Sequence, residues 1–388
     1  MTEPKGRGLG WLEPALEVLS RRYFGRVAAD ADWGVECWMR ATGAALAERL
    51  GPALAEACAV AGVSVPKQCR AVLAVARLEN ERRTEEQEQE LAELGPAFQE
   101  AGIRPILFKG LALARYYPAR AARETGDVDL LVAPEELCGA EEVLRAAGYE
   151  HWAGGGGLSA SYAVTFGRYG DHGEEQTVDL HPAWHEVAVG AAGIEVAVGE
   201  SREPVAAGDV AGTRWNLLPP SVELYLTAAH AVLHGNRTLS VYLDLAVQLA
   251  AAGESTVAAT TQLARFQGRD RHLKHALTAA AELFGLDLDP GHVTTLRRLG
   301  VPVGVRLGYA GAGFRLVPSS LVMELALRRG LRRKLAFLRW VVGHRGAAAV
   351  KANGRHSVGR LRRAVRGFRW LKGRVLRYRV LGSVPLRP

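Results

Sequence analysis

Two aspartates one residue apart, Asp127 and Asp129, open an apolar run in the stretch RETGDVDLLV. Successive side chains of a strand point to opposite faces, so a strand here would turn both carboxylates to one face and Val128 and Leu130 to the core. Two carboxylates about 7 Å apart repel each other and favour a cation between them. Oxygen ligands of this kind suit Mg²⁺, which binds one or two carboxylates together with substrate phosphates.

A third carboxylate and a phosphate-binding turn would complete such a site. Asp179 lies in QTVDLHPAW, a predicted strand, and would supply the third carboxylate of a two-metal site. Lys109 and Gly110 lie at a strand-to-helix turn, where glycine allows close backbone approach and lysine is available to a phosphate. Such a site would polarise the α-phosphate of a nucleotide, activate an attacking hydroxyl and neutralise the leaving pyrophosphate.

The helices and strands predicted around these residues indicate an α+β fold. Apolar residues at helical spacing predict helices over residues 1–100, the last of them a long helix opened by Pro66 and ended by Gly102. The next stretch predicts the order β-α-β-α-β-β-β, beginning with the strand at 103–108. From about Pro219 the spacing is helical again.

These patterns divide the 388 residues into four parts. We expect an N-terminal helical region over 1–100, an α+β core over 101–218, a C-terminal helical region over 219–342 and a basic tail over 343–388.

Composition restricts the protein class. The first residues lack the pattern of a secretory signal, and no apolar run of about 18 residues predicts a spanning helix. The spacing of the four cysteines matches no zinc or redox pair, so we expect buried thiols in a reducing cytoplasm. They are Cys37, Cys58, Cys69 and Cys138.

At these residues the sequence resembles the uncharacterised nucleotidyltransferase family of the DNA polymerase β-type superfamily, which is found in bacteria. The resemblance covers roughly residues 70–260, and its motifs are ILFKGLALARYYPARAARETGDVDLLV, VDLHPAWH and HAVLHGNRTLSVYLDL. It implies a polymerase β-like mixed sheet and a Mg²⁺-dependent enzyme that moves a nucleoside monophosphate from an NTP to a hydroxyl-type acceptor. The acceptor would be a small molecule, a peptide or a protein.

The resemblance also implies roles for single residues. Asp127, Asp129 and Asp179 would bind Mg²⁺, while Lys109 and Gly110 would occupy the turn that holds the nucleotide phosphates. The superfamily usually has Gly-Ser at that turn, and the serine is missing here. A non-catalytic polymerase β-like binding module is therefore an alternative. The K-G…R-x-T-x-D-x-D arrangement is similar to that of abortive-infection nucleotidyltransferase toxins, which makes transfer to tRNA a second alternative.

Polar residues just before the two aspartates are further candidates for nucleotide binding. Arg123, with Thr125 between it and Asp127, could clamp a triphosphate through paired hydrogen bonds, and so could Arg120. The alternative for either arginine is a surface salt bridge or a contact that orients Asp127.

Histidines near the predicted site allow a structural and a functional interpretation. His181 would border the metal site or simply pair with Asp179. His230 and His234 have a spacing seen in zinc sites, but no third ligand is evident, so we expect a helix packed on the catalytic module. Asp244 lies in an apolar helix and needs a partner, for which either histidine of that pair is a candidate.

Charge is distributed unevenly along the chain. Residues 321–388 contain 19 Lys or Arg and one acidic residue, which leaves 30 basic and 40 acidic side chains in residues 1–320. Arginines interleaved with aromatic side chains in the tail suit RNA, and a basic amphipathic stretch suits an anionic membrane surface. Docking of the tail on the acidic body of the same protein is the third interpretation.

Overall fold

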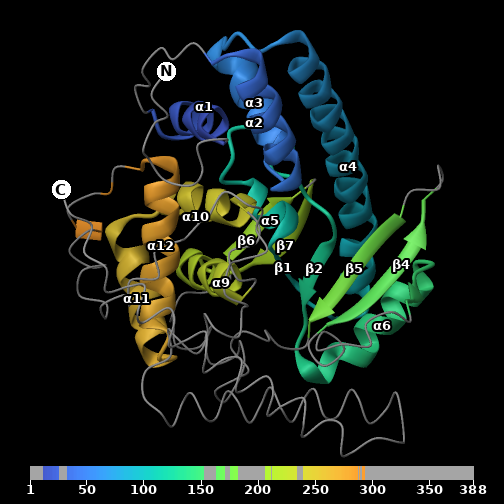
Figure 1. Ribbon diagram of the computed structural model, residues 1–388. Coiled ribbons are helices and arrows are strands. Elements are labelled where there is room, and N and C mark those ends of the chain that lie inside the picture. Colours follow the sequence, from blue (N-terminus) through green and yellow to red (C-terminus); the bar gives the residue numbers. More distant parts are fainter. Residues whose placement is uncertain are drawn as a thin grey trace, which may run out of the picture.

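The computed structural model describes residues 12–25, 33–152, 163–170, 175–181, 206–210, 212–233, 239–286, 288 and 291–292. The glycines of residues 154–157, His234, residues 293–342 of the predicted C-terminal helical region and the basic tail of residues 343–388 lie outside these residues. Within them, helices lie on both sides of one seven-stranded mixed sheet (Figure 1), so the α+β prediction is confirmed.

The described N-terminal part is helical, as predicted: α1 (Glu13–Phe24), α2 (Val35–Ala47), α3 (Gly51–Ala61) and α4 (Lys67–Glu100). Helix α4 begins directly after Pro66, and Gly102 follows it at φ +73°, a conformation that glycine adopts without strain. Good helix formers dominate its sequence, and Arg77 pairs with Glu81 one turn later at 2.7 Å. This helix extends from the N-terminal helices along the sheet to α6 (Leu137–Ala146), shown in Figure 1.

The sheet has the strand order β3-β4-β5-β2-β1-β7-β6. Its strands are β1 (Ile106–Phe108), β2 (Val128–Leu131), β3 (Glu150–His151), β4 (Val164–Tyr169), β5 (Glu175–His181), β6 (Ala206–Val210) and β7 (Thr213–Leu217). Strand β2 pairs antiparallel with β1 on one side and parallel with β5 on the other. The segments ILF, VDLL and VDLH of the motifs singled out in the sequence therefore lie on three adjacent strands at the centre of the sheet.

Alternation along these central strands separates two cores. Val128 and Leu130 point to one face and pack with the second half of α4 and with α6. Phe108 and Leu131 point to the other face and join the core of the N- and C-terminal helices. Asp129 shares that second face with Leu131, because the two are separated by one residue on β2.

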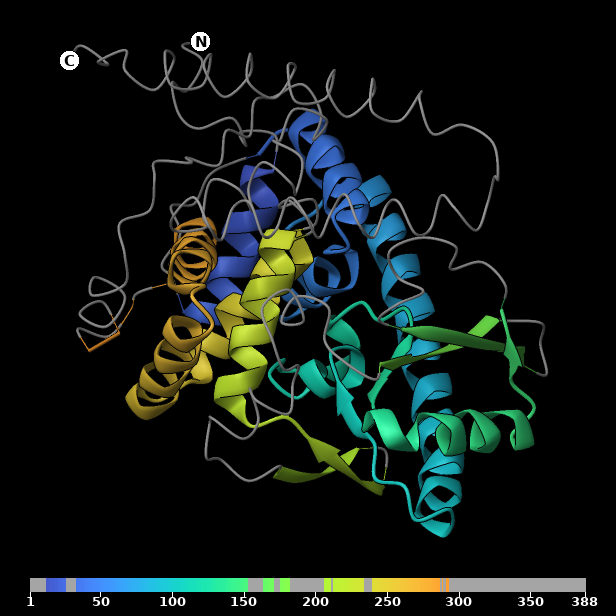
Figure 2. The ribbon, with the colours of Figure 1, turned by 90° about the horizontal axis from the view of Figure 1, so that it is seen from below.

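The C-terminal helices complete the second core: α9 (Pro220–Leu233), α10 (Leu239–Ala251), α11 (Glu254–Phe266) and α12 (Asp270–Phe284). Buried residues of these helices and of α1 to α3 form one hydrophobic cluster, to which Leu19, Leu54, Leu245 and Leu277 belong. Figure 2 shows the helices gathered on one side of the molecule and the β6–β7 hairpin at its edge. Helices α1 to α3 and the C-terminal helices therefore pack against the same face of the sheet, the face that carries Asp129, whereas the second half of α4 packs against the opposite face.

Two features differ from the sequence-based expectations. Strands β6 and β7 were not predicted, although they form a hairpin through Gly212 and β7 pairs parallel with β1. The expectation of four buried thiols is wrong for Cys138, which is exposed, and Cys37 is half-buried. No described helix is long and apolar enough to cross a membrane.

Candidate active site

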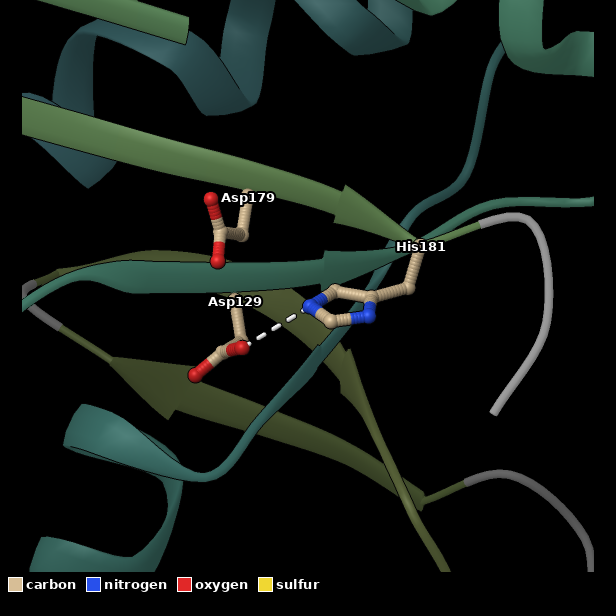
Figure 3. Close-up of side chains that lie close together, drawn as sticks. All are labelled: Asp129, Asp179 and His181. Atoms are coloured by element: carbon tan, nitrogen blue, oxygen red, sulfur yellow. Dashed lines mark hydrogen bonds and ion pairs between the residues drawn. The ribbon is translucent and has the colours of Figure 1, made fainter. Parts of the chain in front are cut away.

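The centre of the site is a pair of aspartates on neighbouring parallel strands. The register of β2 and β5 places Asp129 directly opposite Asp179. Asp129 is only 3% exposed, and Asp179 is half-buried. Ligand atoms of Asp129, Asp179 and His181 all lie within 4.8 Å of one another (Figure 3). The structure therefore brings together two carboxylates that are 50 positions apart in the sequence.

Asp127 lies immediately before β2 and adds a third negative charge. Its pKa is raised to about 6, first by the charge of Asp129, then by burial and by Asp179. The negative charges of Asp129 and Asp179 that act on Asp127 favour a cation at this site. Carboxylate oxygens are the ligands that Mg²⁺ prefers, so the residues present fit the metal that the sequence implied.

His181 holds the carboxylate of Asp129. Its Nε2 lies 2.9 Å from Asp129 Oδ1, and both side chains are almost completely buried. The edge of the imidazole meets the Phe108 ring at a centroid distance of 5.0 Å, which fixes the plane of the histidine. Of the two interpretations of His181, the structure supports the one in which it borders the carboxylate cluster, where it contacts Asp129.

Lys109 brings a positive charge to the same oxygen. Its Nζ lies 2.9 Å from Asp129 Oδ1, and its side chain is 23% exposed. Burial alone would raise the pKa of Asp129, but the Lys109 ammonium and then the hydrogen bond from His181 hold this pKa well below its ordinary value. Asp129 is therefore a carboxylate anion under physiological conditions.

The backbone at Lys109 is strained. Its φ is +54° and its ψ is −143°, a conformation that costs a residue other than glycine about 1–3 kcal/mol. The next residue, Gly110, also has a positive φ of 29°, and a Cβ there would meet the backbone oxygen of Asp127 at 3.1 Å. The turn between β1 and α5 (Gly110–Ala114) thus lies directly against the segment that carries the aspartates.

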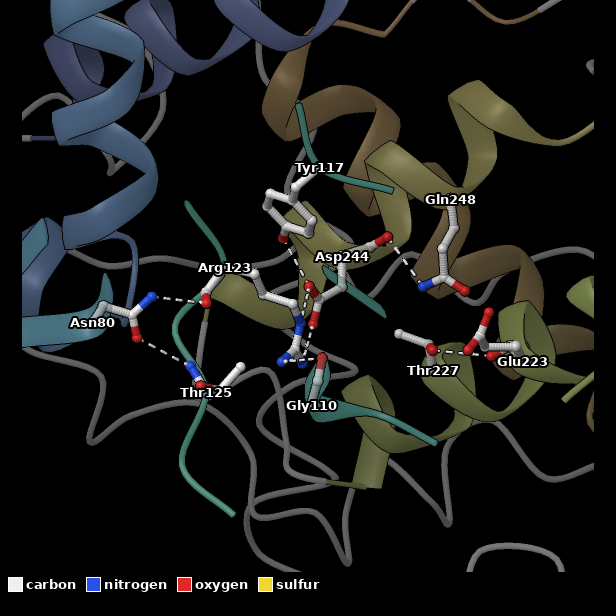
Figure 4. Close-up of polar contacts among 9 residues, drawn as sticks. All are labelled: Asn80, Gly110, Tyr117, Arg123, Thr125, Glu223, Thr227, Asp244 and Gln248. Carbon is white, nitrogen blue, oxygen red and sulfur yellow. Dashed lines mark hydrogen bonds and ion pairs between the residues drawn. The ribbon is translucent and has the colours of Figure 1, made fainter. Parts of the chain in front are cut away.

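Arg123 joins this turn to the C-terminal helices. Its Nε and Nη2 form two hydrogen bonds of 2.9 and 3.0 Å to the carboxylate of Asp244 on α10, and its Nη1 donates to the carbonyl of Gly110 at 3.0 Å. The Tyr117 hydroxyl donates to Asp244 Oδ1 at 2.7 Å (Figure 4). Asp244, for which a histidine partner was expected, is therefore bound by an arginine and a tyrosine.

Asn80 on α4 holds the segment before β2 from the other side. Its Nδ2 donates to the carbonyls of Ala121 at 2.7 Å and Arg123 at 2.9 Å, and its Oδ1 accepts from the backbone N–H of Thr125 at 3.3 Å. Asn80 is 4% exposed. Sequence reasoning missed this residue, for which the one signal was an asparagine, a weak helix former, inside a long charged helix.

The remaining candidates occupy different surroundings. Arg120 pairs with Glu88 at 2.8 Å in a largely exposed ion pair, which is the surface salt bridge considered as its alternative. Thr125 is buried, and its nucleotide contact stays a prediction. The charges of Lys109 and Asp129 both act on the pKa of His230 on α9. Burial is the main reason that this pKa falls to about 3.

Comparison with known proteins identifies the family of this chain. The model of a family described as "Uncharacterised nucleotidyltransferase" matches residues 36–285. The chain therefore belongs to this family and is a transferase by that membership, as its motifs implied. A solved structure of an antigenic nucleotidyltransferase-like protein from Paracoccidioides brasiliensis is 12% identical, with 55% of this chain and 93% of that chain covered at a TM-score of 0.35. A search of curated proteins finds no match.

Proposed function

We propose that this protein is a Mg²⁺-dependent nucleotidyltransferase of the bacterial cytoplasm, which transfers a nucleoside monophosphate from an NTP to a hydroxyl group and releases pyrophosphate. The observation that carries the proposal is the register of Asp129 opposite Asp179, with Asp127 beside them, in a chain of this family. The acceptor would be a small molecule, a peptide or a protein.

Each residue of the site has a role in this proposal. Asp127, Asp129 and Asp179 would hold Mg²⁺, which when bound supplies polarisation of the α-phosphate and neutralisation of the leaving pyrophosphate. His181 keeps the Asp129 carboxylate in one orientation through its 2.9 Å contact. Lys109 contributes an ammonium group to the triphosphate.

The proposed transfer forms one bond to the α-phosphorus and breaks another. The attacking hydroxyl oxygen forms a bond to the α-phosphorus, while the bond from that phosphorus to its bridging oxygen breaks and pyrophosphate leaves. Asp179, half-buried beside Asp129, would either hold the catalytic metal or take the proton of the hydroxyl as a base. The Gly110 turn, held by Arg123 through its carbonyl, keeps the phosphates in line with the acceptor.

Transfer to tRNA is the second candidate function. The observation in its favour is the sequence of the tail, since residues 321–388 contain 19 Lys or Arg against one acidic residue. Basic side chains interleaved with aromatic ones bind single-stranded nucleic acid through phosphate contacts and stacking. A protein lacking residues 343–388 should then lose affinity for tRNA, and unchanged affinity would refute the role of the tail.

Labelled nucleotides test the proposed reaction. With Mg²⁺ and a set of candidate acceptors, label from an α-labelled NTP should appear on an acceptor, whereas label from a γ-labelled NTP should appear only in pyrophosphate. The Asp127→Asn variant should abolish both signals. Transfer of the γ-label would indicate a kinase instead, and no turnover by the wild type with any of the acceptors would contradict the proposal and favour a binding module.

A further inference from the structure

In this structure, the positive charge beside the Asp129 carboxylate is the ammonium group of Lys109. Asp129 Oδ1 is contacted by Lys109 Nζ and by His181 Nε2, each at 2.9 Å. An oxygen that accepts from two nitrogen groups has its lone-pair directions filled. The Lys109 ammonium must therefore leave this oxygen before the oxygen can serve as a metal ligand.

The charge of Lys109 acts on the cluster as a whole. Lys109 Nζ lies 2.9 Å from Asp129 Oδ1, and the turn that carries this lysine lies against Asp127, since a Cβ on Gly110 would meet the Asp127 backbone oxygen at 3.1 Å. A positive group that stabilises these carboxylates as anions also repels any second cation that approaches them. Free metal ions in solution thus compete with a cation that is covalently tethered at the site.

The backbone conformation of Lys109 indicates that its contact with Asp129 belongs to a functional site. A non-glycine residue at φ +54° persists only where the surrounding structure holds it, and such residues cluster at functional sites. With 23% of its side chain exposed, the lysine is in reach of a ligand arriving from solvent. A triphosphate provides several anionic oxygens, so it offers the ammonium a partner that can replace Asp129.

We propose that Lys109 is a specificity-determining residue, which makes the site accept a divalent ion together with a triphosphate and reject the free ion. This inference rests on the proposed function, because it assumes that the three aspartates are metal ligands. The ammonium neutralises Asp129 in the free protein and moves to the phosphates when the nucleotide binds. Metal and nucleotide then bind with positive coupling, each increasing the affinity for the other.

The experiment compares Mn²⁺ binding to the full-length wild type and to Lys109→Met, measured by the loss of the free Mn²⁺ signal in electron paramagnetic resonance. Without nucleotide, the variant should bind Mn²⁺ at least about tenfold more tightly, the effect of removing one unit charge at close range. With a non-hydrolysable NTP analogue present, the variant should lose affinity for the nucleotide. Lys67→Met, at an exposed lysine that begins α4, is the matched control and should behave as the wild type in both titrations.

A second variant, Lys109→Gly, is included in case Lys109→Met does not fold. Lys109→Gly removes the ammonium and also the backbone strain, so a folded protein is expected from it, with the same gain in free Mn²⁺ affinity. Equal or weaker binding of free Mn²⁺ by both variants would overturn the role of Lys109. If the wild type still releases pyrophosphate from NTP in that case, the proposed function survives. If the wild type neither binds Mn²⁺ with nucleotide nor releases pyrophosphate, both proposals fail.

Discussion

The ion pair between Arg123 and Asp244 should be the polar contact on which the site region depends most for its stability. The two side chains are 13% and 4% exposed, and two hydrogen bonds of 2.9 and 3.0 Å join them. Asp244→Asn keeps the shape of the side chain but leaves the guanidinium buried without its counter-charge. Removing one partner of a buried ion pair costs about 3–5 kcal/mol, so we expect a loss of this size in the free energy of unfolding.

Urea unfolding followed by tryptophan fluorescence measures this loss. The matched control is Glu124→Gln, which breaks the Arg49–Glu124 pair, whose side chains are 46% and 25% exposed. A pair this exposed is worth about 0–1 kcal/mol. A double variant, Arg123→Met with Asp244→Leu, should recover much of the loss because it leaves no buried charge unpaired. If Asp244→Asn is no more destabilising than Glu124→Gln, the proposed importance of the pair is refuted.

Three further predictions follow from buried groups. Asn80→Ala should lower the free energy of unfolding by about 1–3 kcal/mol and reduce NTP turnover, because two backbone carbonyls before β2 lose their hydrogen-bond donor. Urea titration measures the first effect, and pyrophosphate release measures the second. Burial raises the pKa of Glu90 from 4.5 to about 7, so the contribution of Glu90 to stability is complete below about pH 4.5 and is lost as the pH rises through 7. In the Glu90→Gln variant the melting temperature should therefore depend less on pH between pH 5 and 8. Gly167→Ala should lower the melting temperature, since a Cβ there would lie 2.1 Å from the Trp152 ring.

The central strands of the site could be predicted from local sequence. Apolar runs with carboxylates at alternate positions indicate strands that carry Asp129 and Asp179 on one face, and the resemblance to the family indicates that these strands are neighbours. The structure adds the register, which places the two aspartates directly opposite each other. Alternation also gave the correct core positions, since Val128 and Leu130 are buried on the opposite face.

The contacts that hold the site could not be predicted in the same way. Arg123 and Asp244 are 121 positions apart, and Asn80 meets the backbone of Arg123 across 43 positions. Periodicity describes one element at a time, so it identifies neither partner of a pair between distant elements. For that reason only His230 and His234, which are close in the sequence, were considered as partners of Asp244. Strand β6 was missed because its sequence, AAGDV, contains alanine and glycine, which have low strand propensity.

The central claim is that the aspartates on β2 and β5 perform nucleotidyl transfer, and pyrophosphate release tests it most directly. The measurement compares the wild type with Asp129→Asn and with Asp209→Asn, a control at the β6–β7 hairpin, where Asp209 accepts from the backbone N–H of Gly212 in an exposed contact. Wild type and Asp209→Asn should release pyrophosphate from NTP in the presence of Mg²⁺ at similar rates. The Asp129→Asn variant should be at least about a hundredfold slower, because the Mg²⁺ that neutralises charge in the transition state would lose one of its ligands. Equal rates for all three proteins would contradict the assignment of the site.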